Sequence, residues 1–172
     1  MKFIIRLMII AITSTLLFAS CSDDDDNNPN NNNNNNSDAP MSCTISGEYD
    51  IEFEASMVQY SSVPGDDEMI RTLTGYMTHE GKTHALIITF HDPNGNFKKD
   101  YIIDQDMSEG FITFLYDRGD GIAPESYYLN ISGNINFATL TATNAIGTFN
   151  CQAQTLDGSK QITVKNGVIN KK

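Results

Sequence analysis

From Met41 to the C-terminus, apolar and polar residues alternate with a period of two, and Gly, Asn, Asp and Pro interrupt the alternation at short intervals. This pattern is typical of short, half-buried strands joined by turns. About nine strands are expected, in the segments 43–57, 69–81, 83–90, 97–104, 110–117, 125–133, 134–142, 146–154 and 160–169. No crossover helix separates them, so the sequence predicts an all-β fold, either an antiparallel β-sandwich or a small β-barrel of about nine strands.

The first segment, "CTISGEYDIEFEASM", shows the alternation most clearly. The positions expected to face the core are Cys43, Ile45, Tyr49, Ile51, Phe53, Ala55 and Met57. The positions between them include Glu48, Asp50, Glu52 and Glu54. We therefore expect one half-buried strand with a charged outer face. Residues 61–68, "SSVPGDDE", are expected to form a loop.

Three local features refine this pattern. The apolar spacing in "MIRTLTGYMTHEG" (69–81) also fits a helix, but its threonines and the central Gly75 favour a strand. In "NINFATLTA" the apolar positions change parity between Phe137 and Leu140, which predicts a β-bulge. Asp157-Gly158 indicates a tight hairpin between the last two strands.

The N-terminal 20 residues have the organisation of a secretory signal peptide. Lys2 and Arg6 precede an apolar stretch from Leu7 to Ala19 that ends in small residues. The stretch is shorter than the roughly 20 apolar residues that a helix needs to cross a bilayer. We therefore expect residues 1–20 to be removed during export.

Cys21 follows this segment directly. The sequence "FASC" (18–21) resembles a bacterial lipobox, in which the cysteine is acylated and becomes the N-terminus of the mature protein. Phe18 stands where the motif usually has an aliphatic residue, and an ordinary cleaved secretory signal is the alternative. Two or three acyl chains give stable anchoring, so the resemblance implies that the protein's partner is a membrane, held through the lipid on Cys21.

The residues after Cys21 extend this prediction. An acidic run resembles the export signal that sends Bacteroidota lipoproteins to the cell exterior, and it consists of Ser22, Asp23, Asp24, Asp25 and Asp26. The Asn-rich remainder of residues 21–40 has almost no apolar side chain, so it is expected to be a disordered tether. We expect an outer-membrane protein at the cell surface that presents residues 41–172 as one β-domain.

The charge balance excludes some partners. The chain has a net charge of −11. Residues 1–40 contain five aspartates and two basic residues, which leaves 17 acidic and 9 basic residues, a net charge of −8, for residues 41–172. Such a domain repels phosphate backbones, so nucleic acid is not expected to bind.

Cys43 and Cys151 form a candidate disulfide. Both share parity with apolar neighbours, and two cysteines in an exported domain favour a bridge. In the entropic model a loop of about 107 residues contributes up to ~4–5 kcal/mol. The alternative is two separate buried thiols that behave as small apolar side chains.

The last hundred residues resemble one family of Bacteroidota surface lipoproteins that has no established activity. The resemblance rests on "LTG" (73–75), "ALIITF" (85–90), "NGNF" (94–97), "NISGNINFATLTA" (130–142), "IGTF" (146–149) and "ITVKNGVI" (162–169). It implies an antiparallel β-domain at the cell surface and supplies no catalytic residue. The "SGEY" at 46–49 gives a looser likeness to calycin-type barrels, which implies an apolar ligand in the barrel interior.

The residue types that carry catalysis or bind metals are not arranged in a recognisable site. His79, His84 and His91 are spaced so that they do not share one strand face, so no metal site is expected. Residues 92–100, "DPNGNFKKD", resemble a calcium loop superficially, but a turn is the better interpretation. The "RGD" at 118–120 is explained by a hairpin tip. With no nucleophile motif, we expect no enzyme and no cofactor.

The tyrosines are the remaining candidates for ligand contact. Tyr76, Tyr127 and Tyr128 could form an aromatic platform, with Tyr101 and Tyr116 as further members. Adjacent residues of a strand point to opposite faces, so one of Tyr127 and Tyr128 must point outward. We expect a non-catalytic domain that binds a glycan, a peptide or a partner lipoprotein. The alternatives are a structural envelope protein without a small ligand and a calycin-like barrel that holds an apolar molecule.

Overall fold

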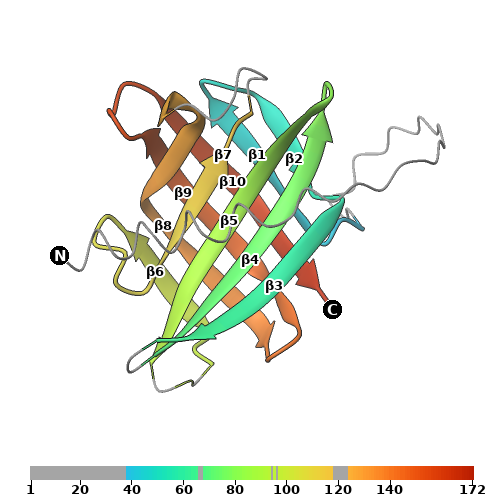
Figure 1. Cartoon of the computed structure of the whole chain (residues 1–172), viewed down its shortest axis with the longest axis vertical. Coiled ribbons are helices and arrows are strands. Elements are labelled where there is room, and N and C mark those ends of the chain that lie inside the picture. The colour runs from blue at the N-terminus through green and yellow to red at the C-terminus, as the bar shows by residue number, and fades with distance from the viewer. Residues whose placement is uncertain (1–37, 66–67, 94, 96, 118–123) are drawn as a thin grey trace. The chain divides into compact units, whose positions relative to one another are not determined.

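The computed structural model describes residues 38–65, 68–93, 95, 97–117 and 124–172 (Figure 1). All of them belong to one compact unit, Asn35–Lys172. The described chain forms ten strands and one short 3-10 turn, and thus confirms the all-β prediction. The strands are β1 (Met41–Gly47), β2 (Ile51–Glu54), β3 (Met57–Pro64), β4 (Glu68–His79), β5 (Lys82–Pro93), β6 (Asp100–Asp104), β7 (Gly110–Leu115), β8 (Tyr127–Leu140), β9 (Ala145–Thr155) and β10 (Gln161–Lys171).

The strands pair in the order β2-β1-β10-β9-β8-β7-β5-β4-β3, and β6 pairs with β8 beside this path. Each of these pairs is antiparallel. The two ends of the order, β2 and β3, are consecutive in the chain and meet at a corner. There Ala55 N–H donates to the Met41 carbonyl at 2.8 Å, and Ser56 N–H donates to the Tyr76 carbonyl at 2.9 Å. Because the neighbouring residues Ala55 and Ser56 bond to strands at the two ends of the order, the sheet is strongly curled into a half-barrel, which we call the barrel, although β2 and β3 do not pair with each other.

The prediction of a single strand over residues 43–57 is wrong. Gly47 has a φ of +125°, and a Cβ there would lie 2.6 Å from the Gln161 carbonyl oxygen, so the chain turns and forms β1 and β2. The corner after Ala55 then reverses the parity of the side chains. Met57 is 50% exposed as a result, and Val58 takes the inward position. The predicted loop over 61–68 is also too long, because β3 continues to Pro64.

Two other local predictions are confirmed. Residues 69–79 form most of β4, as a strand. The register of β8 shifts between Phe137 and Thr139, where a bulge was predicted. The prediction of two strands over 125–142 is wrong, because residues 127–140 form the single strand β8. A second shift lies between Asn130 and Ser132. Gly158 has a φ of +70° in the β9–β10 hairpin.

The barrel interior is filled by two groups of aromatic rings. In one, Phe53 and Phe114 meet edge to face with centroids 6.2 Å apart. In the other, Phe90 lies 5.0 Å from both Tyr101 and Phe137. Fully burying such a side chain stabilises the fold by about 1.5–3 kcal/mol. A cavity lined by Phe53, Phe90 and Phe114 would favour a calycin-like barrel, but these three rings pack against other rings.

Asn130 fills the gap between β6 and β7, which both border β8. Its side-chain oxygen accepts from the Ile112 N–H at 2.9 Å, and its amide donates to the Asp104 carbonyl at 2.7 Å. These two bonds replace backbone ladder bonds that are lost where β6 and β7 separate. The buried Asn130 thus satisfies backbone groups that would otherwise lack partners.

Candidate functional site

A polar hollow of about 420 Å³ lies on the surface over β8, β9 and β10. Gly133 contributes to its lining and adds no side chain. Cys151 and Val164 also line it, and the polar residues of the lining are Ser132, Asn150, Gln152, Thr163, Lys165 and Asn166. We call this site the polar hollow.

Two bulges position the polar hollow. Between Asn130 and Ser132, β8 has one more residue than β9 opposite it. Between Val164 and Gly167, β10 has one extra residue against β9, and Asn166 in this stretch has a φ of +53°. Bulges bend a strand and re-aim its side chains. The sheet is therefore curved and locally irregular on both sides of β9, and the hollow lies between these irregularities.

The side chains of the polar hollow offer hydrogen-bonding groups. Asn150 donates to the Asn134 side-chain oxygen at 2.7 Å. Within the described chain, Ser132, Gln152 and Lys165 make no side-chain hydrogen bond, and all three are exposed. Hydroxyl, amide and ammonium groups in the hollow suit a ligand that is rich in hydroxyl groups.

The tyrosine platform is only partly assembled. Tyr127 points outward and is half-buried, whereas Tyr128 is fully buried in the barrel. Tyr76 also lies on the outer face, and cross-strand pairing joins it to Ala85, then Leu115, then Tyr127. Three strand spacings of about 4.8 Å separate Tyr76 from Tyr127. The two rings are too far apart to hold one sugar ring between them.

The other two tyrosines considered as platform members pack within the fold. Tyr101 is 1% exposed. Tyr116 stacks on Tyr49 with ring centroids 3.9 Å apart, and on its other side lies His84 at 4.6 Å. These rings cover one end of the barrel core, where Tyr49 and Tyr116 pack against buried residues.

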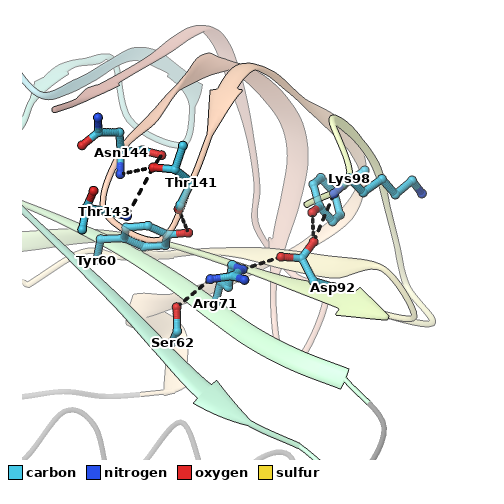
Figure 2. A network of polar contacts seen from close by, with 9 residues as sticks. Tyr60, Ser62, Arg71, Asp92, Lys98, Thr141, Thr143 and Asn144 are labelled. Atoms are coloured by element: carbon cyan, nitrogen blue, oxygen red, sulfur yellow. Dashed lines mark hydrogen bonds and ion pairs between the residues drawn. The ribbon is translucent and has the colours of Figure 1, made fainter. Parts of the chain in front are cut away.

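A buried ion pair lies near the other group of rings (Figure 2). Arg71 is 5% exposed and Asp92 is fully buried. The Nε of Arg71 donates to the Asp92 carboxylate, and its Nη1 donates to Ser62 Oγ at 2.9 Å. The Tyr101 hydroxyl donates to the second Asp92 oxygen. Burial and the adjacent Asp92 carboxylate raise the pKa of Tyr101, so this hydroxyl stays protonated.

Neighbouring side chains cover this pair. The Phe97 ring lies against the Arg71 guanidinium, with Cζ 4.1 Å from the ring centroid. The Tyr60 hydroxyl donates to the Thr141 carbonyl at 3.0 Å and so ties β3 to the β8–β9 turn, as Figure 2 shows. Because Arg71 and Asp92 already satisfy each other, we interpret this network as a structural element and not as a ligand site.

The network was not predicted, although the sequence contains a signal for it. Arg71 has the same parity as Leu73, Gly75 and Met77, which face the core. A charged residue at a core position needs a partner, and Asp92 continues the inward parity of Phe90. A search for charges at inward positions would have found both residues.

The candidate disulfide between Cys43 and Cys151 is not formed, and both residues are free buried thiols. β10 lies between β1 and β9, so the two cysteines are two strand spacings apart. That separation is about 9–10 Å, whereas the Cα atoms of a disulfide lie within about 7 Å of each other. Cys43 and Cys151 are therefore two separate buried thiols, which was the alternative expectation.

Neither thiol should react while the barrel is folded. Burial raises the pKa of Cys151 to about 12 and the pKa of Cys43 still further, so almost no thiolate exists at pH 8. Iodoacetamide at pH 8 is expected to leave the Asn35–Lys172 unit unmodified and to add two groups in 6 M guanidinium without reductant. Intact mass measures both results. An unmodified mass in guanidinium would show a disulfide instead.

Two of the three histidines approach each other: the His79 and His84 rings lie with their centroids 6.3 Å apart at the β4–β5 hairpin. His84 is buried in the barrel, in phase with Leu86 and Ile88, and burial lowers its pKa. His91 lies within β5 and not at a turn, and its Nδ1 is 3.1 Å from a Glu68 carboxylate oxygen. Among the described residues, no group of three or more His, Cys, Asp or Glu side chains could hold a metal ion.

Several predicted features lie outside the described residues. They are the signal peptide, Cys21, the acidic run that follows it, Asn94 and Asn96 of the superficial calcium loop, and the RGD tripeptide. Gly95, which is described, donates its N–H to the Asp92 carbonyl at 3.1 Å, as in a turn. In the described part of the chain no helix is long and apolar enough to cross a membrane.

Comparison with protein-family models, with curated proteins and with solved structures finds no match for this chain.

Proposed function

We propose that this chain is a lipid-anchored, non-catalytic binding protein of the cell surface, and that it binds a glycan in the polar hollow. The observation that carries the proposal is the hollow itself, a concave surface whose exposed Ser132, Gln152 and Lys165 side chains make no side-chain hydrogen bond within the described chain. Vicinal sugar hydroxyls match side-chain amides such as Gln152, which both donate and accept. Lys165 adds one positive charge, which favours a sugar that carries a carboxylate.

The barrel interior is a weaker candidate. A calycin-like protein holds its ligand inside the barrel, and the strand order here is compatible with that architecture. However, Phe53, Phe90 and Phe114 are each no more than 1% exposed, and they contact other rings. The outer surface is the better place for a ligand.

The N-terminal sequence supports the proposed location. Acylation of Cys21 would hold the chain on the outer membrane, and the run Ser22–Asp26 would direct it to the exterior. About 20 tether residues span roughly 25 Å, enough to lift the barrel from the headgroups. A surface position gives the polar hollow access to extracellular glycans.

A glycan array probed with the Asn35–Lys172 unit tests the binding site. This unit contains the whole core from Met41 to Ile169, so it is expected to fold alone. We expect binding to at least one hydroxyl-rich glycan, and the Gln152→Ala variant is expected to weaken it at least tenfold, because one lost hydrogen-bonding group costs about 1.4 kcal/mol or more. The matched control is Tyr76→Ala, which should bind as the parent does.

Three results would overturn parts of this proposal. Silence across the array would remove the glycan function. Loss of binding in Tyr76→Ala but not in Gln152→Ala would move the site to the tyrosine face. The fluorescent form of a bound glycan, applied to intact cells that produce the full chain, tests the location. Staining only after the outer membrane is broken would overturn surface display.

A further inference from the structure

Among the described residues that line the polar hollow, Lys165 is the only charged one. Its side chain is exposed, and it takes part in none of the ion pairs that the described residues form. By contrast, Lys98 and Lys160 pair with Glu109 and Glu48. Within the described chain, the ammonium group of Lys165 is therefore available to an anionic group of a ligand.

One side of the polar hollow is bordered by acidic residues of β2. Lys165 pairs across the sheet with Thr44 of β1, and Thr44 pairs with Glu52 of β2. The Glu52 carboxylate accepts a hydrogen bond from Thr44 Oγ1 at 3.0 Å, and Glu54 is exposed further along β2. Two strand spacings of about 4.8 Å separate Lys165 from Glu52. An anionic group that extends beyond Lys165 in this direction therefore meets like charge.

The opposite side of the polar hollow is also acidic. β6 pairs with β8 there, so that Asp104 lies opposite Ser132 of the lining and Asp100 lies opposite Asn136. The Asn136 amide donates to Asp100 at 2.7 Å, and the Met107 N–H donates to Asp104 at 3.0 Å. Neither carboxylate forms an ion pair with a described residue. A second like-charged border therefore faces any ligand that crosses β8.

The polar hollow is thus a narrow strip with one cation and acidic residues on both sides. Two strand spacings separate β8 from β10, which makes the strip about 10 Å wide. Its other polar groups, such as those of Asn150 and Gln152, are uncharged and suit hydroxyl groups. Charges act over about 8 Å at physiological salt. Both borders are therefore close enough to oppose a second anionic group, while Lys165 attracts the first.

We propose that the ligand of the polar hollow is a glycan with a single carboxylate, such as one hexuronate among neutral sugars. This inference rests on the proposed glycan function and narrows it to one class. The carboxylate contacts Lys165, and the neutral sugars extend over β9 toward β8. A polyanionic glycan would place its further charges beside Glu52 or Asp104. The net charge of −8 on residues 41–172 also opposes the approach of such a ligand.

A glycan array of matched pairs, probed with the Asn35–Lys172 unit, tests this inference. Each pair holds a glycan with one hexuronate and the same glycan with the corresponding neutral hexose. At low salt we expect the acidic member to bind about fivefold more tightly, as is typical of one exposed ion pair. The preference should disappear at about 1 M salt, where charges act only over about 3 Å. Sulfated glycans and polyuronates should bind more weakly than the single-uronate glycans.

Variants show whether Lys165 and Glu52 set the preference. Lys165→Met is expected to bind both members of a pair equally, whereas Lys165→Arg should keep the preference. Lys82→Met removes the same charge at the β4–β5 hairpin, so it is the matched control and should keep the preference as well. Glu52→Gln is expected to strengthen polyuronate binding about twofold at low salt. Glu80→Gln, in the same hairpin as Lys82, should not change it.

The possible results separate this inference from the proposed glycan function. If the parent binds acidic and neutral members equally and Gln152→Ala weakens both, the single-carboxylate class is wrong and the glycan function stands. A preference that Lys82→Met abolishes as fully as Lys165→Met would show that net charge selects the ligand, and the inference would fall. Stronger binding to polyuronates than to single-uronate glycans would also overturn it. Silence on every pair would remove the glycan function together with the inference.

Discussion

Replacing Arg71 with methionine is expected to lower the free energy of unfolding by about 3–5 kcal/mol. Asp92 is fully buried, and Arg71 is the cation that neutralises it. Methionine fills much of the space of the arginine stem but leaves the Asp92 carboxylate buried without its counter-charge. Urea unfolding followed by circular dichroism measures the effect as a lower midpoint with an unchanged m-value.

Two further variants show whether the buried charge is the cause. In Arg71→Met with Asp92→Asn, no charge is left uncompensated, and Asn can still accept a hydrogen bond from Tyr101, so at least half of the loss should be recovered. Lys98→Met removes the partner of Glu109 in a more exposed pair and is expected to cost at most about 1 kcal/mol. If Arg71→Met costs no more than Lys98→Met, the interpretation of a structural ion pair is wrong.

The fold could be predicted because its main determinant is local. Alternation of apolar and polar residues requires only that one face of each strand is buried, and it identified most strands and the bulge near Phe137. The same rule failed at the first segment. The alternation runs on through the turn after Gly47, so parity alone could not show that β1 and β2 are separate strands.

The candidate sites could not be predicted because they depend on register. The polar hollow requires the extra residue of β10 near Asn166 to lie beside the bulge of β8 near Ser132, and these residues are far apart in the sequence. Because adjacent residues of a strand point to opposite faces, the sequence did predict that only one of Tyr127 and Tyr128 faces the core. The position of Tyr76 level with Tyr127 across the sheet depends on how β4, β5, β7 and β8 pair, and the sequence alone does not give this pairing.

Glycine at position 133 is expected to be essential, because β8 approaches β9 very closely there. A Cβ on Gly133 would lie 2.2 Å from the Asn150 carbonyl oxygen and 2.7 Å from Cys151 Cα, with φ at +156°. These are mostly backbone atoms, which cannot rotate away. Gly133→Ala is therefore expected to cost about 3 kcal/mol or more, as the sum of strain and overpacking. Thermal and urea unfolding measure the loss.

Gly158→Ala separates the two causes. Gly158 also has a positive φ, +70°, but a Cβ there meets nothing within 4 Å. Only the backbone cost remains, about 1–2 kcal/mol. An equal loss in both variants would mean that the close approach at Gly133 relaxes without cost. A clearly larger loss at Gly133 would show that β8 and β9 are held together at this point, which is also where Gly133 and Asn150 line the polar hollow. The stability of the barrel and the shape of its candidate binding site would then depend on the same glycine.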